Sequence, residues 1–311
     1  MEPTPEPSRA VSVARAHLDR GFRLEQAGTL DRALDEYRKA LTTAASPDDE
    51  AESHLRIARV YRSTADWERC RQHSDKSVEI ATAAGLDDLA AEALNIEFGA
   101  LQSQGRFDEA DAIGQRAIAL ARSPRVRGIT LQNLGRSSAE RRDFKTSDRY
   151  FMESIDAFRS ANYELGLAIA LGNASRAALD RGDAQRSVEI GNEAITIARR
   201  LNSLDTLLTA VQNQAAAFMA TGKLDSAETL LTEALGHFTS ARNPIRQAEC
   251  LEIMGQIGEL RSDWETAVRC YTRAGDLAAG AKDNPLAERL RRRRESAVIM
   301  RARSGNPEDA A

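Results

Sequence analysis

The sequence has 311 residues and a formal net charge of −4, and aromatic side chains occupy only 5% of its positions. This charge gives no overall basic character that would favour nucleic acid or a membrane surface as a partner. Apolar runs are far shorter than the ~20 residues of a membrane-spanning helix, and three cysteines do not make a disulfide framework, so we expect a cytoplasmic protein.

Residues 1–8 contain three prolines and lack the apolar core of a signal peptide, so we expect them to form a flexible tail.

The chain then repeats in blocks of about forty residues, each with small residues at fixed places. The first such place is held by Ala33, Cys70, Ala110, Ser147, Ser187, Ala227 and Ala267. A second small residue follows seven positions later in every block. Twelve positions before the first place come Gly21, Ala58, Phe98, Gly135, Ser175, Ala215 and Gly255, where only Phe98 is large.

Turn and cap residues divide each block into two helices. Glycines that stop first helices and bring the chain round are Gly28, Gly105, Gly182 and Gly222. Candidate N-caps of second helices are Thr29, Asp66, Asp143, Asp183 and Asp263. A cap residue followed by proline begins a first helix at Ser46-Pro47, Ser123-Pro124, Asn243-Pro244 and Asn284-Pro285. We expect the closest contacts within a hairpin where two small residues meet, as at Ser175 and Ser187.

These signals predict seven helical hairpins, followed by one more helix at 283–303 and a tail at 304–311. The hairpins cover 9–45, 47–84, 86–122, 124–161, 162–201, 202–241 and 243–282. We expect the last helix to cap the array, because a stack of repeats needs a terminal element with a polar outer face. The hairpin that contains Phe98 is where we expect irregular packing.

Two turns carry a resemblance to a known family. Gln26-Ala-Gly-Thr-Leu-Asp-Arg-Ala33 and Gln104-Gly-Arg-Phe-Asp-Glu-Ala110 resemble the turns of tetratricopeptide repeats, which place a glycine before an acidic turn and a small residue. The resemblance covers residues from about 10 to 282, in a long variety with repeats of about 40 residues instead of the usual ~34. It implies an all-α fold, a right-handed α-solenoid of seven hairpins and a C-terminal capping helix.

In the resembling family the first helices line a concave groove, and the fifth and sixth positions of each repeat point into it. The asparagines and glutamines at these positions are Asn95, Gln132, Asn133, Asn173, Gln212 and Asn213. The arginines on the same or nearby phases are Arg56, Arg59, Arg62, Arg136 and Arg176. A carboxamide can pair with a peptide backbone through both its donor and its acceptor, and arginine can bind a carboxylate. The same asparagines could instead hydrogen-bond within the array.

We find no motif of a phosphate-binding loop, a dinucleotide-binding fold or a zinc protease, and we expect no enzyme activity, metal or cofactor. His17 and His54 occupy equivalent places in adjacent blocks, which favours helix packing over metal binding. The leading hypothesis is a scaffold that binds an extended peptide or protein segment, acidic or with a free C-terminus. The alternatives are a peptide-sensing regulator that acts through a partner, nucleic-acid binding through Arg291–Arg294, which the net charge argues against, and self-association.

Overall fold

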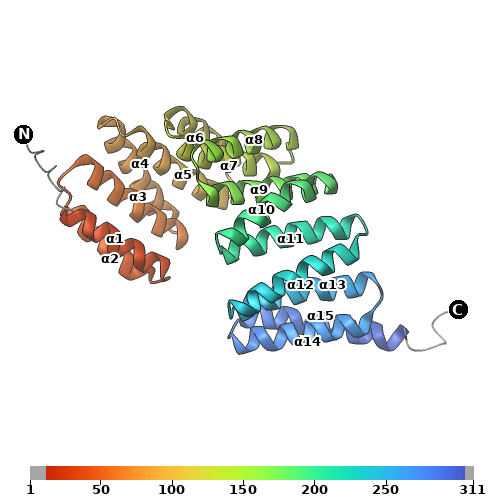
Figure 1. Cartoon of the computed structure of the whole chain (residues 1–311). Coiled ribbons are helices and arrows are strands. Elements are labelled where there is room, and N and C mark those ends of the chain that lie inside the picture. The colour runs from red at the N-terminus through yellow and green to blue at the C-terminus, as the bar shows by residue number, and fades with distance from the viewer. Residues whose placement is uncertain (1–11, 305–311) are drawn as a thin grey trace, which may run out of the picture. The chain divides into compact units, whose positions relative to one another are not determined.

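A computed structural model of the chain describes residues 12–304 (Figure 1). The tail expected at 1–8, and the one expected at 304–311 apart from Ser304, lie outside these residues. The described chain folds entirely into helices and turns, with 85% helix and no strand. Its helices are α1 (Val13–Gln26), α2 (Leu30–Thr42), α3 (Pro47–Ser63), α4 (Trp67–Ala83), α5 (Asp87–Ser103), α6 (Phe107–Leu120), α7 (Pro124–Glu140), α8 (Phe144–Ser160), α9 (Glu164–Asp180), α10 (Ala184–Arg200), α11 (Leu204–Ala220), α12 (Leu224–Ser240), α13 (Pro244–Leu260), α14 (Trp264–Gly280) and α15 (Asn284–Ser304).

The helices form two compact units. The first ends at Tyr163 and holds α1 to α8, and the second begins at Glu164 and holds α9 to α15. Within each unit, successive helices contact each other as hairpins, and successive first helices also touch, α1–α3–α5–α7 in one unit and α9–α11–α13 in the other. The fold is therefore an all-α solenoid of helical hairpins, as predicted. Among residues 12–304, no helix is both long enough and apolar enough to span a bilayer.

Most of the predicted stop and start signals act as expected. The four turn glycines all have φ between +70° and +92°, a conformation that costs glycine nothing. Asp66, Asp143, Asp183 and Asp263 each accept a backbone N–H as N-cap. Thr29 stands at the cap of α2, but its hydroxyl donates to the Leu24 carbonyl and caps nothing.

The start of α15 differs from the prediction. Asn284 lies inside the helix, and Asp283 is the residue whose carboxylate accepts the N–H of Leu286, at 3.1 Å. An aspartate one residue earlier thus takes the cap, and its charge also suits the positive end of the helix dipole.

Close helix contacts form where small residues meet. The Ser175 hydroxyl donates to the Ser187 carbonyl at 2.9 Å, which confirms the predicted contact between α9 and α10. At Gly135 an added Cβ would lie 2.9 Å from the ring of Phe151 on α8. Each glycine of this kind therefore makes room for a large side chain of the paired helix.

The histidine that shares its repeat position with His17 forms a half-buried pair with another histidine. The Nδ1 atoms of His54 on α3 and His73 on α4 lie 2.8 Å apart, so one ring donates a hydrogen bond to the other. Burial lowers the pKa of both rings, and the neighbouring charges of His54 and Arg38 help to lower that of His73 to about 4. The part of the chain that the structure describes holds no group of three or more His, Cys, Asp or Glu side chains placed to bind a metal.

This pair predicts that the protein loses stability in mild acid. Above pH ~6.5 the rings are neutral in both the folded and the unfolded state; below it, only the unfolded chain binds protons, so the free energy of unfolding falls. We expect a loss of about 1–2 kcal/mol between pH ~6.5 and ~4, after allowance for partial exposure. Urea unfolding followed by circular dichroism at pH 7 and pH 5 measures it. A His73→Phe variant should show a flatter pH dependence, and an unchanged one would contradict the assignment.

Candidate functional site

Polar side chains join successive first helices of the first unit. We call the side of each unit on which the first helices lie next to one another the first-helix face. These helices are α1, α3, α5 and α7 in the first unit and α9, α11 and α13 in the second. Between α1 and α3, Arg59 makes a two-pronged ion pair with Glu25, with N–O distances of 2.7 Å. Glu25 also accepts the hydroxyl proton of Tyr37, at 2.7 Å. The pKa of Arg59, which burial alone would lower, is raised because this carboxylate stabilises the charged form.

Arg56 is bound within its own helix. Its guanidinium donates to Glu52 at 2.8 and 3.2 Å and lies 5.5 Å from the centre of the Phe22 ring on α1. Phe22 is 43% exposed, so this cation–ring contact is open to solvent. Arg56 and Arg59 therefore each already hold a carboxylate.

The asparagines between α5 and α7 bind one another. Asn95 is 6% exposed and donates to the Thr130 hydroxyl at 2.8 Å, while its carbonyl oxygen accepts from Asn133 at 3.2 Å. Asn133 is half-buried, and its own carbonyl oxygen stays available. The neighbouring Gln132 is half-buried as well, and its Oε1 meets no donor among the described residues. Asn95 thus braces the array, whereas Asn133 and Gln132 keep unused acceptors.

Arg62 and Arg136 approach from either side of α5. Arg62 is half-buried and makes no hydrogen bond or ion pair with any residue in 12–304. It lies against Gly99, where a Cβ atom would come 2.5 Å from its Nη1. Arg136 donates to Oε1 of Gln102 at 2.7 Å and is otherwise 3.9 Å from the exposed Glu140. These two arginines are the predicted site residues whose charge the first unit leaves poorly compensated.

In the second unit one predicted residue, Asn173, lines a hollow between α9 and α11. The hollow measures about 160 Å³, and its walls include Ile169, Gly172, Asn173, Thr206 and Thr209. The carboxamide of Asn173 has no hydrogen-bond partner within residues 12–304.

The other predicted residues of this unit differ in whether their side chains already have partners within the described chain. Asn213 is 7% exposed and donates to the Gly172 carbonyl at 3.0 Å, so it braces the array as Asn95 does. Gln212 is half-buried, and Arg176 is exposed and paired with Asp180 four residues on. Asn173 is therefore the predicted carboxamide that the second unit leaves most free.

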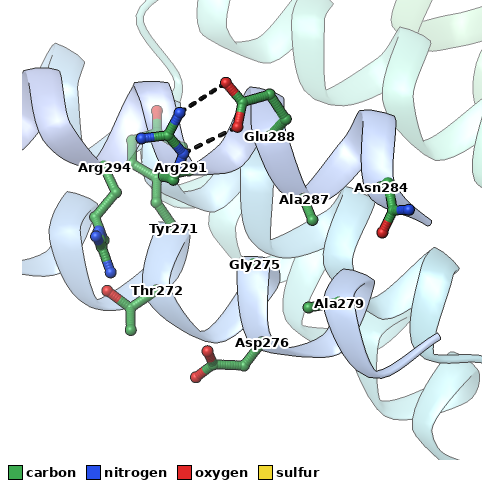
Figure 2. A pocket seen from close by; sticks show the side chains of 10 residues that line it. All are labelled: Tyr271, Thr272, Gly275, Asp276, Ala279, Asn284, Ala287, Glu288, Arg291 and Arg294. Carbon is green, nitrogen blue, oxygen red and sulfur yellow. Dashed lines mark hydrogen bonds and ion pairs between the residues drawn. The ribbon is translucent and has the colours of Figure 1, made fainter. Parts of the chain in front are cut away.

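A hollow near the C-terminus lies between α14 and α15 (Figure 2). It measures about 470 Å³, and Gly275, Ala279 and Ala287 widen it. Arg291 and Arg294 line it, and Arg291 is held by Glu288 and Glu295 at 2.8 to 2.9 Å.

The rest of the arginine run is also largely engaged. Arg292 binds Glu288, and Arg293 lies 3.3 Å from Glu252 of α13, a carboxylate that Arg289 also holds. Three of the four arginines in the run at 291–294 thus serve ion pairs that tie α15 together or to α13, an arrangement typical of a terminal helix.

Comparison with known proteins identifies the type of this fold. No protein-family model matches the sequence. Among solved structures, a signal-transduction ATPase with numerous domains from Pyrococcus horikoshii, which has a tetratricopeptide repeat sensor, is similar, with a TM-score of 0.68 and 14% identity. A type IV pilus biogenesis factor, PilW, is similar over 74% of this chain and 96% of its own, with a TM-score of 0.54 and 16% identity. The fold is of the tetratricopeptide-repeat type.

The extent of these matches differs between the neighbours. The similarity covers 89% of this chain and 44% of the ATPase, so the chain spans less than half of that protein. A Rap protein complexed with Competence and Sporulation Factor matches 88% of this chain and 76% of its own, with a TM-score of 0.59 and 18% identity. At such identities the shared feature is the tetratricopeptide-repeat fold itself.

Sequence reasoning missed several residues at these places. Gly99 and Gln102 of α5 lie between the two poorly compensated arginines, and Ile169 with Thr206 and Thr209 forms the hollow beside Asn173. One signal for Gly99 was present: a glycine inside a predicted helix and outside the small-residue positions marks a close approach by something else. The others became recognisable only once neighbouring helices were in place.

Proposed function

We propose that the protein is a non-enzymatic scaffold that binds an extended peptide or protein segment on the first-helix face of its tetratricopeptide-repeat units. The observation that carries this proposal is the hollow between α9 and α11. There the carboxamide of Asn173 has no partner in the described chain, and Ile169 is 37% exposed beside it. A carboxamide offers a donor and an acceptor to a peptide backbone, while the apolar wall takes a side chain.

The first unit supports a partner with negative charge. Arg62 and Arg136 lie on its first-helix face without full compensation, and Asn133 keeps an acceptor for a backbone N–H group. Side-chain carboxylates and a free C-terminus both suit such arginines. The proposed partner is therefore a segment with acidic residues or a free C-terminus.

A second candidate is a peptide-sensing regulator that acts through another protein. It is favoured by the kind of structures that resemble this chain: one is a signal-transduction ATPase with a tetratricopeptide repeat sensor, and another is a Rap protein complexed with Competence and Sporulation Factor. In this case the same first-helix face binds the signal, and a second surface transmits it.

The proposal predicts that Asn173→Ala weakens peptide binding without loss of stability, because no hydrogen bond within the described chain is removed. The probe is a mixture of randomised ten-residue peptides, captured on the immobilised full chain and identified by mass spectrometry. Calorimetry with a captured peptide should show about tenfold weaker binding, the value of one or two lost hydrogen bonds.

The matched variant is Asn213→Ala, which removes the buried bond to the Gly172 carbonyl and should lower the melting temperature. Asn133→Ala is a less clean test, because it also deprives Asn95 of a donor. The proposal fails if the wild-type chain captures no peptide, or if Asn173→Ala binds captured peptides as tightly as the wild type.

A further inference from the structure

We infer that the hollow between α14 and α15 is a binding site for a small zwitterion, a molecule that carries both an ammonium and a carboxylate group, as a free amino acid does. Arg294 binds the carboxylate, and Asp276 binds the ammonium group. The inference does not depend on the proposed function, because the hollow is formed by α14 and α15, neither of which belongs to the first-helix face.

The outer side of α15 is not built to receive another helix. In α13, Leu251 and Gly255 are buried, and Gly255 lies against the Tyr271 ring of α14. The residues forty positions on are Arg291 and Glu295, which are exposed and bind each other at 2.8 Å. Two charged residues thus stand where a complete hairpin buries a leucine and a glycine. Because charges are costly to bury, a helix is a poor occupant of the hollow beside them.

Gly275 keeps the hollow open. It lies well inside α14, and an added Cβ atom would meet only the Cβ atom of Leu290, at 3.9 Å, which is an ordinary contact. Close packing therefore does not require glycine here, although glycine weakens a helix relative to alanine. The residue forty positions earlier, Leu235 on α12, packs against the core of the following hairpin. Gly275 thus leaves empty a place that the preceding hairpin fills with leucine.

The space suits a small molecule. The hollow measures about 470 Å³, which lies within the range of ~300–1,000 Å³ that is usual for small-molecule sites. Gly275, Ala279 and Ala287 form a small apolar part of its wall, and polar side chains stand around them (Figure 2). An apolar wall with a few polar groups is the common composition of a ligand pocket.

Two opposite charges in this wall have no partner in the described chain. Arg294 is half-buried and makes no hydrogen bond or ion pair within residues 12–304, and the same holds for the exposed Asp276. The other two charged side chains of the wall, Arg291 and Glu288, bind each other through two hydrogen bonds. The charges left for a ligand are therefore one cation and one anion.

A zwitterion matches this pair. A guanidinium binds a carboxylate through two parallel hydrogen bonds, and a carboxylate accepts the N–H groups of an ammonium. Figure 2 shows that Arg294 extends from α15 toward Thr272 of α14, and Asp276 follows Thr272 by about one helical turn. The two charges thus flank the same stretch of the hollow, where one small molecule can bind both.

The first test screens the standard L-amino acids one at a time against the full chain, at about 10 mM, by thermal denaturation. At least one should raise the melting temperature, and calorimetry then gives its affinity. Its amide lacks the carboxylate and its N-acetyl derivative lacks the ammonium group, so each should bind at least about tenfold more weakly.

Dipeptides in the same screen distinguish the two sources of a zwitterion. A dipeptide that binds more tightly than its constituent amino acids identifies the longer molecule as the ligand, and the reverse order identifies the free amino acid. If neither an amino acid nor a dipeptide binds, or if the blocked derivatives bind as tightly as the free ligand, the inference is overturned.

Arg294→Met and Asp276→Asn test the two assigned contacts. Neither variant removes a hydrogen bond or ion pair of the described chain, so without ligand both should melt close to the wild type. Each should bind the ligand at least about tenfold more weakly, and Arg294→Met should no longer distinguish the ligand from its amide. Arg303→Met, on the same helix but outside the hollow, is the matched control and should bind as the wild type does. An Arg294→Met variant that keeps the wild-type preference contradicts the assignment.

Gly275→Leu tests the position of the site. It gives α14 the residue that α12 has at the equivalent place, so it should fill the hollow and abolish binding. The melting temperature should stay the same or rise, because leucine favours a helix more than glycine does. A Gly275→Leu variant that still binds the ligand overturns the inference. If leucine lowers the melting temperature instead, the variants at 276 and 294 decide the outcome, and peptide capture on the first-helix face decides the proposed function separately.

Discussion

Replacement of Gly255 by valine is expected to lower the free energy of unfolding by about 3 kcal/mol, at the upper end of what overpacking costs. A Cβ atom at this position on α13 would lie 2.7 Å from Cζ and 2.8 Å from Cδ1 of Tyr271 on α14. Tyr271 is 1% exposed and packs against this position, so its ring or the two helices must shift. Urea unfolding followed by circular dichroism gives the size of the loss.

The control is the same substitution at Gly236, which is exposed on α12 and has no atom within 4 Å of an added Cβ. There valine replaces glycine in a helix without a clash, and helix propensity predicts a change within about 0.5 kcal/mol, in the stabilising direction. If both variants lost the same stability, the cost would come from valine in a helix, and the small-residue positions would not be sites of close packing.

The helices and their ends could be predicted from the sequence because their causes are local. A glycine at positive φ, an aspartate that accepts an N–H three residues on, and a proline in the first turn all act within one segment of the chain. Gly105 and Asp143 are two instances that the structure bears out. The exception at Asp283 is equally local: two adjacent residues, aspartate and asparagine, both suit the cap, and only the geometry chooses between them.

The character of the candidate site could not be predicted, because it depends on which partners are already engaged. Arg59 and Arg62 are three residues apart on α3, yet one binds Glu25 and the other binds nothing in the described chain. The partner of Arg136 is Gln102, 34 residues earlier on the neighbouring first helix. Sequence periodicity shows that such residues occupy the same position in successive repeats. It does not show that the Asn95 amide donates to Thr130 while Asn173 has no partner in residues 12–304.

Phe98, the exception among the small residues, follows a second rule that the structure reveals. In four hairpins the residue sixteen positions after the first-helix site lies opposite it, and one of the two is glycine while the other is aromatic. Gly21 faces Tyr37, and Gly135 faces Phe151. In the third hairpin the sizes are exchanged, because Phe98 on α5 faces Gly114 on α6. At the hairpin where we expected irregular packing, the glycine and the aromatic residue have thus exchanged helices, and Phe98 is fully buried.

This exchange predicts strong coupling between residues 98 and 114. Phe98→Gly alone should cost about 4 kcal/mol through the cavity it leaves. Gly114→Phe alone should cost about 3 kcal/mol through overpacking, since a Cβ there would lie 3.1 Å from the Phe98 ring and 2.6 Å from Leu134. The double variant restores the order found at Gly135 and Phe151, so its loss should be smaller than the sum by about 2 kcal/mol.

A double-mutant cycle by urea unfolding measures this coupling, with Phe98→Gly paired with Gly236→Ala as the uncoupled reference. Additive losses at 98 and 114 would mean that the two residues fill separate spaces. A favourable coupling would show that glycine opposite an aromatic ring fills the same space in either order. The third hairpin would then obey the same packing constraint as the first, fourth and seventh hairpins, with its two members reversed.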